Sequence, residues 1–369
     1  MSGAGSQPAR DSQSRLRDSA ALLLSLAVCV GVASAADINA IFAPVADAKS
    51  PGVAVLVRQS GRTVFERGYG VRDLRTFARI DARTDFRLAS FTKQFTAMAI
   101  MLLVHDGKLR YDQRLTELFP DFPAYGQAIT IHHLLTHTSG LPDYEELMTG
   151  DTWTPAHQIQ DDEVLALLKQ QKAGKFAPGT SWSYSNSGYV VLGLIVAKVS
   201  GEPYGQFLHK RIFQPLRMSH SVVYVKGKNS IPNRAYGHTK QGDHFVETDQ
   251  SSTSATQGDG GIYSNLEDLA KWDRGLETHA LLSESEMLPA LTPVRLNDGS
   301  QPKAVSYGFG WFLDPFDGRP RMWHTGSTMG FRTVIERFTK DKLTIVVLCN
   351  RTDLDPEKLA LQAARALSQ

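Results

Sequence analysis

Short apolar runs bounded by turn residues lie near both ends of the chain, and their length is typical of β-strands. Residues 52–58 and 62–67 form two such runs, and Ser60-Gly61 between them predicts a hairpin. Four more are predicted near the other end, with a polar turn at 339–342 between the last two: 308–313, 321–324, 331–338 and 343–348. A final helix is expected over 356–367, since a proline near its start loses no helical hydrogen bond.

The centre of the chain has helical periodicity instead. Residues 163–171 and 189–199 carry the pattern, and Ser264 with Glu267 reads as a capping box for a helix that runs to Leu276. Strands at both ends and helices between them predict an α/β (α+β) fold. We expect one antiparallel sheet built from both chain ends and flanked by helices, with an inserted, mainly helical region and the active site between the two.

The first 35 residues resemble a signal peptide. Arginines precede an apolar run over 20–32, and small residues follow at 33–36. Because the run is shorter than the ~20 residues of a spanning helix, we expect cleavage after Ala35 and a secreted or periplasmic protein; an uncleaved anchor is the alternative. The expected domains are therefore a signal peptide at 1–35 and one domain at 36–369. Its sheet region covers about 38–88 and 300–369, and its helical region about 108–290.

Composition excludes several function classes. The 369 residues carry a net charge of +2, which predicts no nucleic-acid partner and no stable membrane insertion after cleavage. Only Cys29 and Cys349 are present, and Cys29 would leave with the signal, so no intramolecular disulfide is expected. Cys349 ends an apolar run and is predicted to be a buried strand residue. Oligomeric state stays open.

Ser90 and Lys93 form the first chemical motif. They stand three residues apart at the start of an apolar run over 91–104, so one helical turn brings the amine to the hydroxyl. A serine hydroxyl needs a neighbouring proton acceptor to become a nucleophile, and a helix N-terminus adds a positive field. The chain holds a second copy of this spacing, Ser300 to Lys303, but a proline interrupts it and no apolar helix follows.

Tyr184 and Asn186 form the second motif, in a polar turn before an apolar helix. A tyrosine acts as a base only if cations lower its pKa from about 10, and Lys93 is a candidate cation. Asn186 offers an amide donor and acceptor for substrate. Taken alone, Tyr184 is typical of a half-buried loop tyrosine. Tyr263-Ser264-Asn265 repeats the triplet, and there we assign the serine to a helix cap.

The third motif, His324-Thr325-Gly326 followed by Ser327, closes a predicted strand. A free strand edge binds extended substrates, and glycine permits close backbone approach. The backbone N–H groups of Ser90 and Ser327 are candidates for an oxyanion hole. Taken alone, His324 is typical of a strand-end histidine with a local hydrogen bond.

Together the three motifs resemble those of the serine β-lactamase and penicillin-binding protein superfamily, in the branch with class C β-lactamases, DD-carboxypeptidases, esterases and D-aminopeptidases. Residues 134–142 and 260–264 also resemble sequence stretches that are usual in this branch. The resemblance implies an acylated Ser90, proton transfer by Lys93 and Tyr184, and substrate binding by Asn186, His324, Thr325 and Gly326. His324 departs from the lysine of most class C β-lactamases, and a neutral histidine suits a carboxylate less well.

The expected function is therefore a secreted serine hydrolase that acts on an amide, ester or lactam, with a D-Ala-type peptide or ester favoured. The alternatives are a class C-like β-lactamase and a penicillin-acylated binding protein without efficient turnover. No cofactor and no metal are expected: His132, His133 and His137 cluster, but no His-Glu-x-x-His is present. An α/β-hydrolase is disfavoured because no Gly-x-Ser-x-Gly occurs. The substrate itself stays open.

Overall fold

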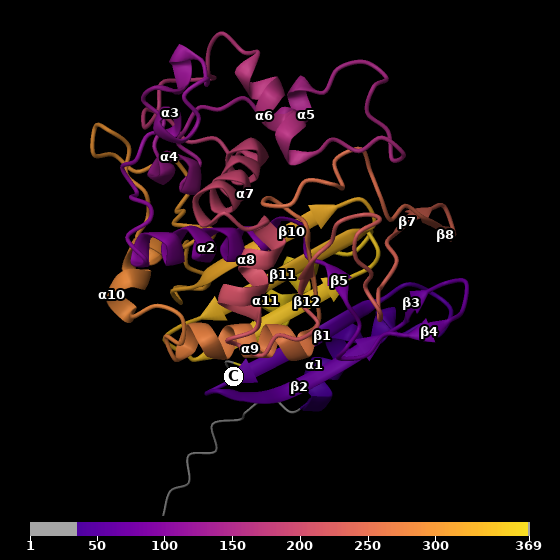
Figure 1. The fold of residues 1–369 in the computed structure, drawn as a ribbon. Coiled ribbons are helices and arrows are strands. Elements are labelled where there is room, and N and C mark those ends of the chain that lie inside the picture. The colour runs from indigo at the N-terminus through magenta and orange to yellow at the C-terminus, as the bar shows by residue number, and fades with distance from the viewer. Residues whose placement is uncertain (1–34, 368–369) are drawn as a thin grey trace, which may run out of the picture.

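A computed structural model describes residues 35–367, and its main feature is a five-stranded antiparallel sheet (Figure 1). The strand order is β10-β11-β12-β1-β2, so the two ends of the chain meet in the middle of the sheet. The bounds are β1 Val53–Gln59, β2 Arg62–Tyr69, β10 Met322–Thr328, β11 Phe331–Phe338 and β12 Leu343–Cys349. The predicted fold class is confirmed. The predicted signal peptide, residues 1–35, lies outside the described part of the chain except for its last residue, Ala35.

Both faces of the sheet are covered, which explains why its inner strands are apolar without alternation. Along β1, Ala54 and Leu56 pack into one core, whereas Val53, Val55 and Val57 pack into another on the opposite face. The second core is closed by α1 (Ala35–Phe42) and α11 (Pro356–Ala366). Cys349 is buried in β12 with a free thiol, as predicted.

The first core joins the sheet to the helices of the middle of the chain. Its long helices are α2 (Lys93–His105), α7 (Asn186–Ser200) and α9 (Leu266–Glu277), and α2 packs on α7. The shorter ones are α3 Leu115–Leu118, α4 Ile131–Leu135, α5 Tyr144–Leu147, α6 Asp161–Lys169, α8 Tyr204–Leu208 and α10 Glu284–Met287. Within the described residues, no helix has the length and apolarity needed to cross a membrane.

Small sheets connect the two regions. β5 (Phe86–Arg87) pairs with β9 (Ile262–Ser264), which also pairs with β6 (Val222–Val223). Two hairpins complete the set: β3 Val71–Asp73 with β4 Ala78–Arg79, and β7 His238–Gln241 with β8 His244–Glu247.

Two local predictions are wrong. Residues 308–313 form no strand, because the chain turns back on itself: the Gly308 N–H donates to the Trp311 carbonyl at 2.9 Å. Gly310 has a φ of +76° there, and its Cα faces the start of α2, where an added Cβ would lie 2.8 Å from the Lys93 carbonyl oxygen. Such a contact between distant segments leaves no local pattern in the sequence.

The cap of α9 is the second correction. Asn265, not Ser264, is the N-cap, and its side-chain oxygen accepts from the Asp268 N–H at 3.0 Å. Ser264 belongs to β9, and its hydroxyl lies 2.8 Å from that of Ser221. The Tyr263-Ser264-Asn265 triplet still has a structural role, because the Asn265 side chain caps the N-terminus of α9.

Candidate active site

Ser90 lies in a short 3-10 helix, Ala89–Thr92, which leads directly into α2 at Lys93. The turn places the Lys93 Nζ atom 3.0 Å from the Ser90 Oγ atom. Ala89 has a φ of +51°, a strained conformation for a residue with a Cβ. The second Ser-x-x-Lys copy at Ser300 lies in a loop, as predicted.

Lys93 is completely buried, and its ammonium group contacts neutral acceptors. Besides Ser90, it donates to the Asn186 Oδ1 atom at 2.9 Å and to the Asp259 backbone carbonyl at 3.0 Å. An ammonium has three donors, so all of its hydrogen-bonding capacity is used. The same three contacts also suit a neutral amine, with Ser90 donating to its lone pair.

Tyr184 lies over this lysine. The Lys93 Nζ atom is 4.9 Å from the Tyr184 ring centroid, and among the described residues the Tyr184 hydroxyl has no hydrogen-bond partner. The ring stacks on the His137 imidazole with a centroid separation of 4.4 Å. His137 also accepts a hydrogen bond from the Ser185 N–H at 3.1 Å, so it anchors the turn that carries Tyr184. The described residues therefore fix the Tyr184 ring and leave its hydroxyl unbonded.

Asn186 is the first residue of α7, and carboxylates surround it. Its N–H donates to the Asp143 Oδ2 atom at 2.8 Å, and its amide nitrogen lies 3.5 Å from the Glu145 Oε1 atom. Burial, followed by the charge of Asp259, raises the pKa of Asp143; burial, followed by Asp143 and Asp259, raises that of Glu145. The polar wall of the site is therefore acidic apart from Lys93.

His324 is buried within the first core and does not face solvent. Its Nδ1 atom lies 2.6 Å from the Thr325 carbonyl oxygen, which fixes the proton on Nδ1 and makes Nε2 an acceptor. The Tyr307 hydroxyl lies 3.3 Å from this Nε2 atom. Burial, followed by the charge of Lys93, lowers the pKa of His324 to about 3. The imidazole is thus neutral at pH 7.

The strand that carries His324 is the outer strand of the main sheet. Phe312 pairs with it at Trp323 through two hydrogen bonds of 2.9 Å, and among the described residues only β11 pairs with 325–328, which leaves that part of β10 as a free edge. Gly326 allows β10 to approach the segment that leads to Ser90: an added Cβ would lie 2.0 Å from the Leu88 carbonyl oxygen. Thr325 and Ser327 point to the opposite face from His324 and Gly326. Ser327 also lines a cavity of about 420 Å³, whose lining includes Glu145, Met148, Trp153, Ser251, Thr253 and Met329.

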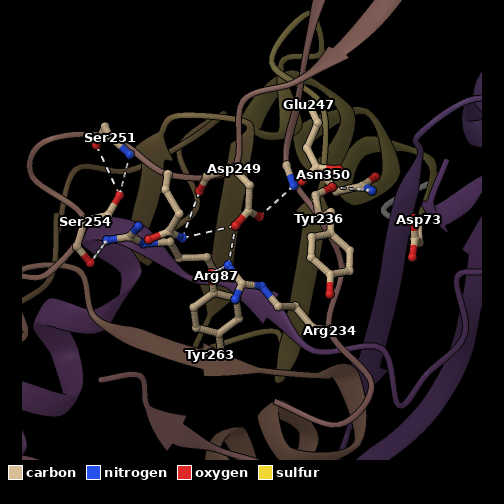
Figure 2. A network of polar contacts seen from close by, with 12 residues as sticks. Asp73, Arg87, Arg234, Tyr236, Glu247, Asp249, Ser251, Ser254, Tyr263 and Asn350 are labelled. Carbon is tan, nitrogen blue, oxygen red and sulfur yellow. Dashed lines mark hydrogen bonds and ion pairs between the residues drawn. The ribbon is translucent and has the colours of Figure 1, made fainter. Parts of the chain in front are cut away.

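A buried polar network supports one wall of that cavity (Figure 2). Arg87, three residues before Ser90, donates to the Ser254 carbonyl at 3.1 Å. Arg234 forms an ion pair with Asp249, and Asp249 also accepts from the Gly237 N–H at 2.9 Å. These contacts hold the 249–254 turn against the segment that leads to Ser90.

His133 and His137, from the histidine cluster seen in the sequence, form hydrogen bonds with the protein backbone. His133 accepts from the Thr130 N–H and belongs to the cap of α4, while His137 supports the Tyr184 turn. Among residues 35–367, no group of three or more histidine, cysteine or acidic side chains is arranged to hold a metal ion. These contacts give the histidines structural roles.

Sequence reasoning missed two residues of the site. Asp259 contributes its backbone carbonyl to Lys93, and Tyr307 hydrogen-bonds to His324. The only signal for Asp259 was its position directly before the 260–264 stretch. Tyr307 had none, because its contact depends on the turn at Gly310.

Most of this chain is similar to known proteins. Residues 38–369 match the family described as Beta-lactamase. Penicillin-binding protein 4* of Bacillus subtilis (strain 168) is 32% identical over 323 residues, which cover 84% of this chain and 70% of that protein.

Solved structures give the same relationship. The octameric penicillin-binding protein homologue from Pyrococcus abyssi superimposes with a TM-score of 0.77 at 28% identity, over 90% of this chain and 77% of that one. The D-amino acid amidase from Ochrobactrum anthropi SV3 has a TM-score of 0.74 at 24% identity, over 90% and 96% of the two chains, and shows the shared fold.

Proposed function

We propose that Ser90 forms the acyl-enzyme in this chain, which belongs to the Beta-lactamase family and is a serine hydrolase. The proposed reaction is the hydrolysis of an amide or ester, with a D-Ala-type peptide or ester favoured. The observation that carries the assignment is the 3.0 Å contact between the Lys93 Nζ and Ser90 Oγ atoms. A buried lysine beside a serine at the start of a helix provides the activation that a hydroxyl nucleophile needs.

In the acylation step, Ser90 Oγ attacks the substrate carbonyl carbon and loses its proton to Tyr184 and Lys93, which act as a shared base. Lys93 suits this role because its contacts to Asn186 and Asp259 hold the amine in place in either protonation state. The base returns the proton to the leaving amine or alcohol as its bond to the acyl carbon breaks. Water then attacks the ester on Ser90, and the acid and free serine are released. Proton transfer of this kind contributes about 10²–10⁴-fold.

The backbone N–H groups of Ser90 and Ser327 would stabilise the oxyanion. Support comes from the close approach of β10 to the nucleophile segment at Gly326, where only a hydrogen fits against Leu88. Thr325 and Gly326 would align an extended substrate along the free edge of β10, and the Asn186 amide would orient its acyl group. One oxyanion donor is typically worth about 10²–10³-fold in kcat.

The charge of the site argues against a substrate that relies on a carboxylate partner at His324. That imidazole is buried and neutral, and Glu145 is the charged residue that lines the cavity beside Ser327. An amide or ester with a neutral group at this edge therefore suits the site better than a penicillin carboxylate. This supports amide or ester hydrolysis over efficient β-lactam hydrolysis.

A substrate panel tests the proposal: a D-alanyl-D-alanine peptide, its C-terminal amide, a chromogenic ester, a D-amino acid amide and a β-lactam. We expect many turnovers per enzyme on at least one ester or amide and slow turnover of the β-lactam. A single stoichiometric burst on every substrate would refute hydrolysis and favour a penicillin-acylated binding protein. His324→Lys should raise kcat/KM for the free acid relative to its amide by about tenfold, since a charged hydrogen bond is worth about 1.5–3 kcal/mol.

Export is a separate proposal that rests on the sequence pattern of the first 35 residues alone. Expression in a bacterial host followed by N-terminal sequencing tests it. A mature chain that begins at Ala36 would agree, and a full-length chain would contradict cleavage.

A further inference from the structure

A cavity of about 870 Å³ is lined by residues from the end of α9, from α10 and from the main sheet, where β10 and β12 begin and β11 ends; Ser90, Lys93 and Tyr184 are not among them. Met322, which begins β10, lines this cavity, whereas Ser327 near the other end of β10 lines the separate cavity of about 420 Å³. Its volume lies within the range of about 300–1,000 Å³ that is usual for small-molecule sites.

Apolar side chains form one part of the cavity walls, beside polar and charged ones. Leu276, Met287, Met322, Phe338 and Leu343 line the cavity, and each is buried from bulk solvent. Leu291 lies at the rim and is 37% exposed. Such walls suit the hydrocarbon part of a ligand.

Among the charged groups at the base of the cavity, hydrogen-bond donors outnumber acceptors. The Asp273 carboxylate is saturated: Arg337 and Thr344 donate to Oδ1, each at 2.7 Å, and Arg58 donates to Oδ2. Asp273 therefore has little capacity left to bind a cation. The two arginines that contact Asp273, Arg58 and Arg337, differ in how many of their own N–H donors have good acceptors.

Arg337 is about nine-tenths buried, lines the cavity and has weak acceptors for two of its three nitrogens. Nη1 contacts the Met322 sulfur at 3.1 Å, and Nη2 lies 3.5 Å from the Asp273 carbonyl oxygen. A thioether is a weak acceptor, and 3.5 Å is long for a hydrogen bond. Arg58, by contrast, donates to the carbonyls of Ala270 and Gly61, each at 2.9 Å, and is not among the residues that line the cavity.

We propose that this cavity binds a small amphiphilic carboxylate, with its head on the Nη1 and Nη2 atoms of Arg337 and its hydrocarbon chain against Leu276, Met287 and Leu291. A planar guanidinium edge matches the two oxygens of a carboxylate. A polyanion fits less well, because Glu277 and Glu284 also line the cavity and offset the charges of Arg274 and Lys342. The site is separate from the hydrolytic centre.

Octanoate, octylamine and octanol, titrated into the full mature chain by calorimetry, test the proposal. The informative pair of variants is Arg337→Lys and Arg58→Lys: the change and the carboxylate partner are the same, but only Arg337 lines the cavity. We expect octanoate to bind the wild type and Arg58→Lys with similar Kd, and Arg337→Lys at least tenfold more weakly. Octylamine and octanol should bind more weakly than octanoate.

Leu291→Trp, a change at the exposed rim, fills the mouth of the cavity and keeps the test valid if Arg337→Lys fails to fold. It should also weaken octanoate binding at least tenfold. Equal octanoate affinity in the wild type and in every folded variant would overturn the proposal, because the acid would then bind elsewhere. No binding at millimolar octanoate, or octylamine binding as tightly as octanoate, would overturn it too.

Discussion

The Tyr307 hydroxyl lies 3.3 Å from the His324 Nε2 atom, and both side chains are buried. With Nδ1 bonded to the Thr325 carbonyl, this contact fixes the orientation of the imidazole, and burial followed by the charge of Lys93 keeps it neutral at the edge of the candidate site. The third sequence motif therefore supplies shape and a free strand edge, and no positive charge.

The neutral His324 should make the protein less stable in acid. Its pKa is about 3 in the folded state and near ~6.5 in the unfolded chain. Between these values the unfolded state holds the proton and the native state does not, so stability is lost as pH falls from about 6.5 towards 3. At pH 5 the loss is about 2 kcal/mol.

Urea unfolding at pH 7.5 and pH 5 measures this loss. His133 and His137 also have lowered pKa values, so the informative quantity is the difference between the wild type and His324→Gln. The wild type should lose about 2 kcal/mol more than the variant. Equal losses would mean that His324 is accessible to protons in the native state.

Asn186→Ala should slow catalysis, because it removes the side-chain acceptor that holds Lys93 at 2.9 Å. A hydrogen bond to a charged group is worth about 1.5–3 kcal/mol, so kcat should fall about 10- to 100-fold. Asn265→Ala, in the repeated Tyr-Ser-Asn triplet, is the matched control. It should keep kcat and lose about 2–4 kcal/mol of stability, because Asn265 caps α9 and also donates to the buried Asp85 carboxylate at 2.8 Å. Equal effects on kcat would contradict the assignment.

Tyr184→Phe should lower kcat by about 10²–10⁴-fold with little change in stability, since the hydroxyl has no partner among the described residues. Tyr189→Phe is its control: that ring also lies over Lys93, at 5.5 Å, but its hydroxyl donates to the Leu135 carbonyl. The control should retain kcat. Steady-state kinetics from pH 5 to 10 separate the two variants, and full activity in Tyr184→Phe would exclude its hydroxyl from proton transfer.

Gly326→Ala should destabilise the protein and abolish activity, because the new Cβ would lie 2.0 Å from the Leu88 carbonyl oxygen and 2.3 Å from the Thr333 hydroxyl. Relief of this clash must move β10 away from Ser90, at a cost of about 1–3 kcal/mol. Gly188→Ala in α7 meets its nearest atom at 3.5 Å and should be tolerated. Thermal unfolding and kcat/KM of both variants test this, and a fully active Gly326→Ala would contradict the close approach.

Sequence patterns were reliable where the physics is local. The hairpin at Ser60-Gly61, the helix after Ser90 and the buried strand at Cys349 each follow from neighbouring residues, and the structure confirms them. The pattern failed at Gly310 and at the cap of α9. There, packing against Lys93 and pairing of β9 decided the conformation.

The candidate site shows the same division. The Ser90–Lys93 contact is one helical turn and was predictable from spacing. The Asp259 carbonyl and the Tyr307 hydroxyl reach the site through contacts between segments far apart in the sequence, so no local motif predicts them. The burial of His324 was also not visible, although its neutrality was anticipated.

Mass spectrometry of the protein after reaction with a fluorophosphonate tests the central claim most directly. The account predicts one adduct, on the peptide that contains Ser90, in the wild type and in Ser300→Ala, which alters the second Ser-x-x-Lys copy. Ser90→Ala should show no adduct and no turnover of any substrate that the wild type hydrolyses. An adduct that persists in Ser90→Ala, or that maps to another serine, would contradict the account.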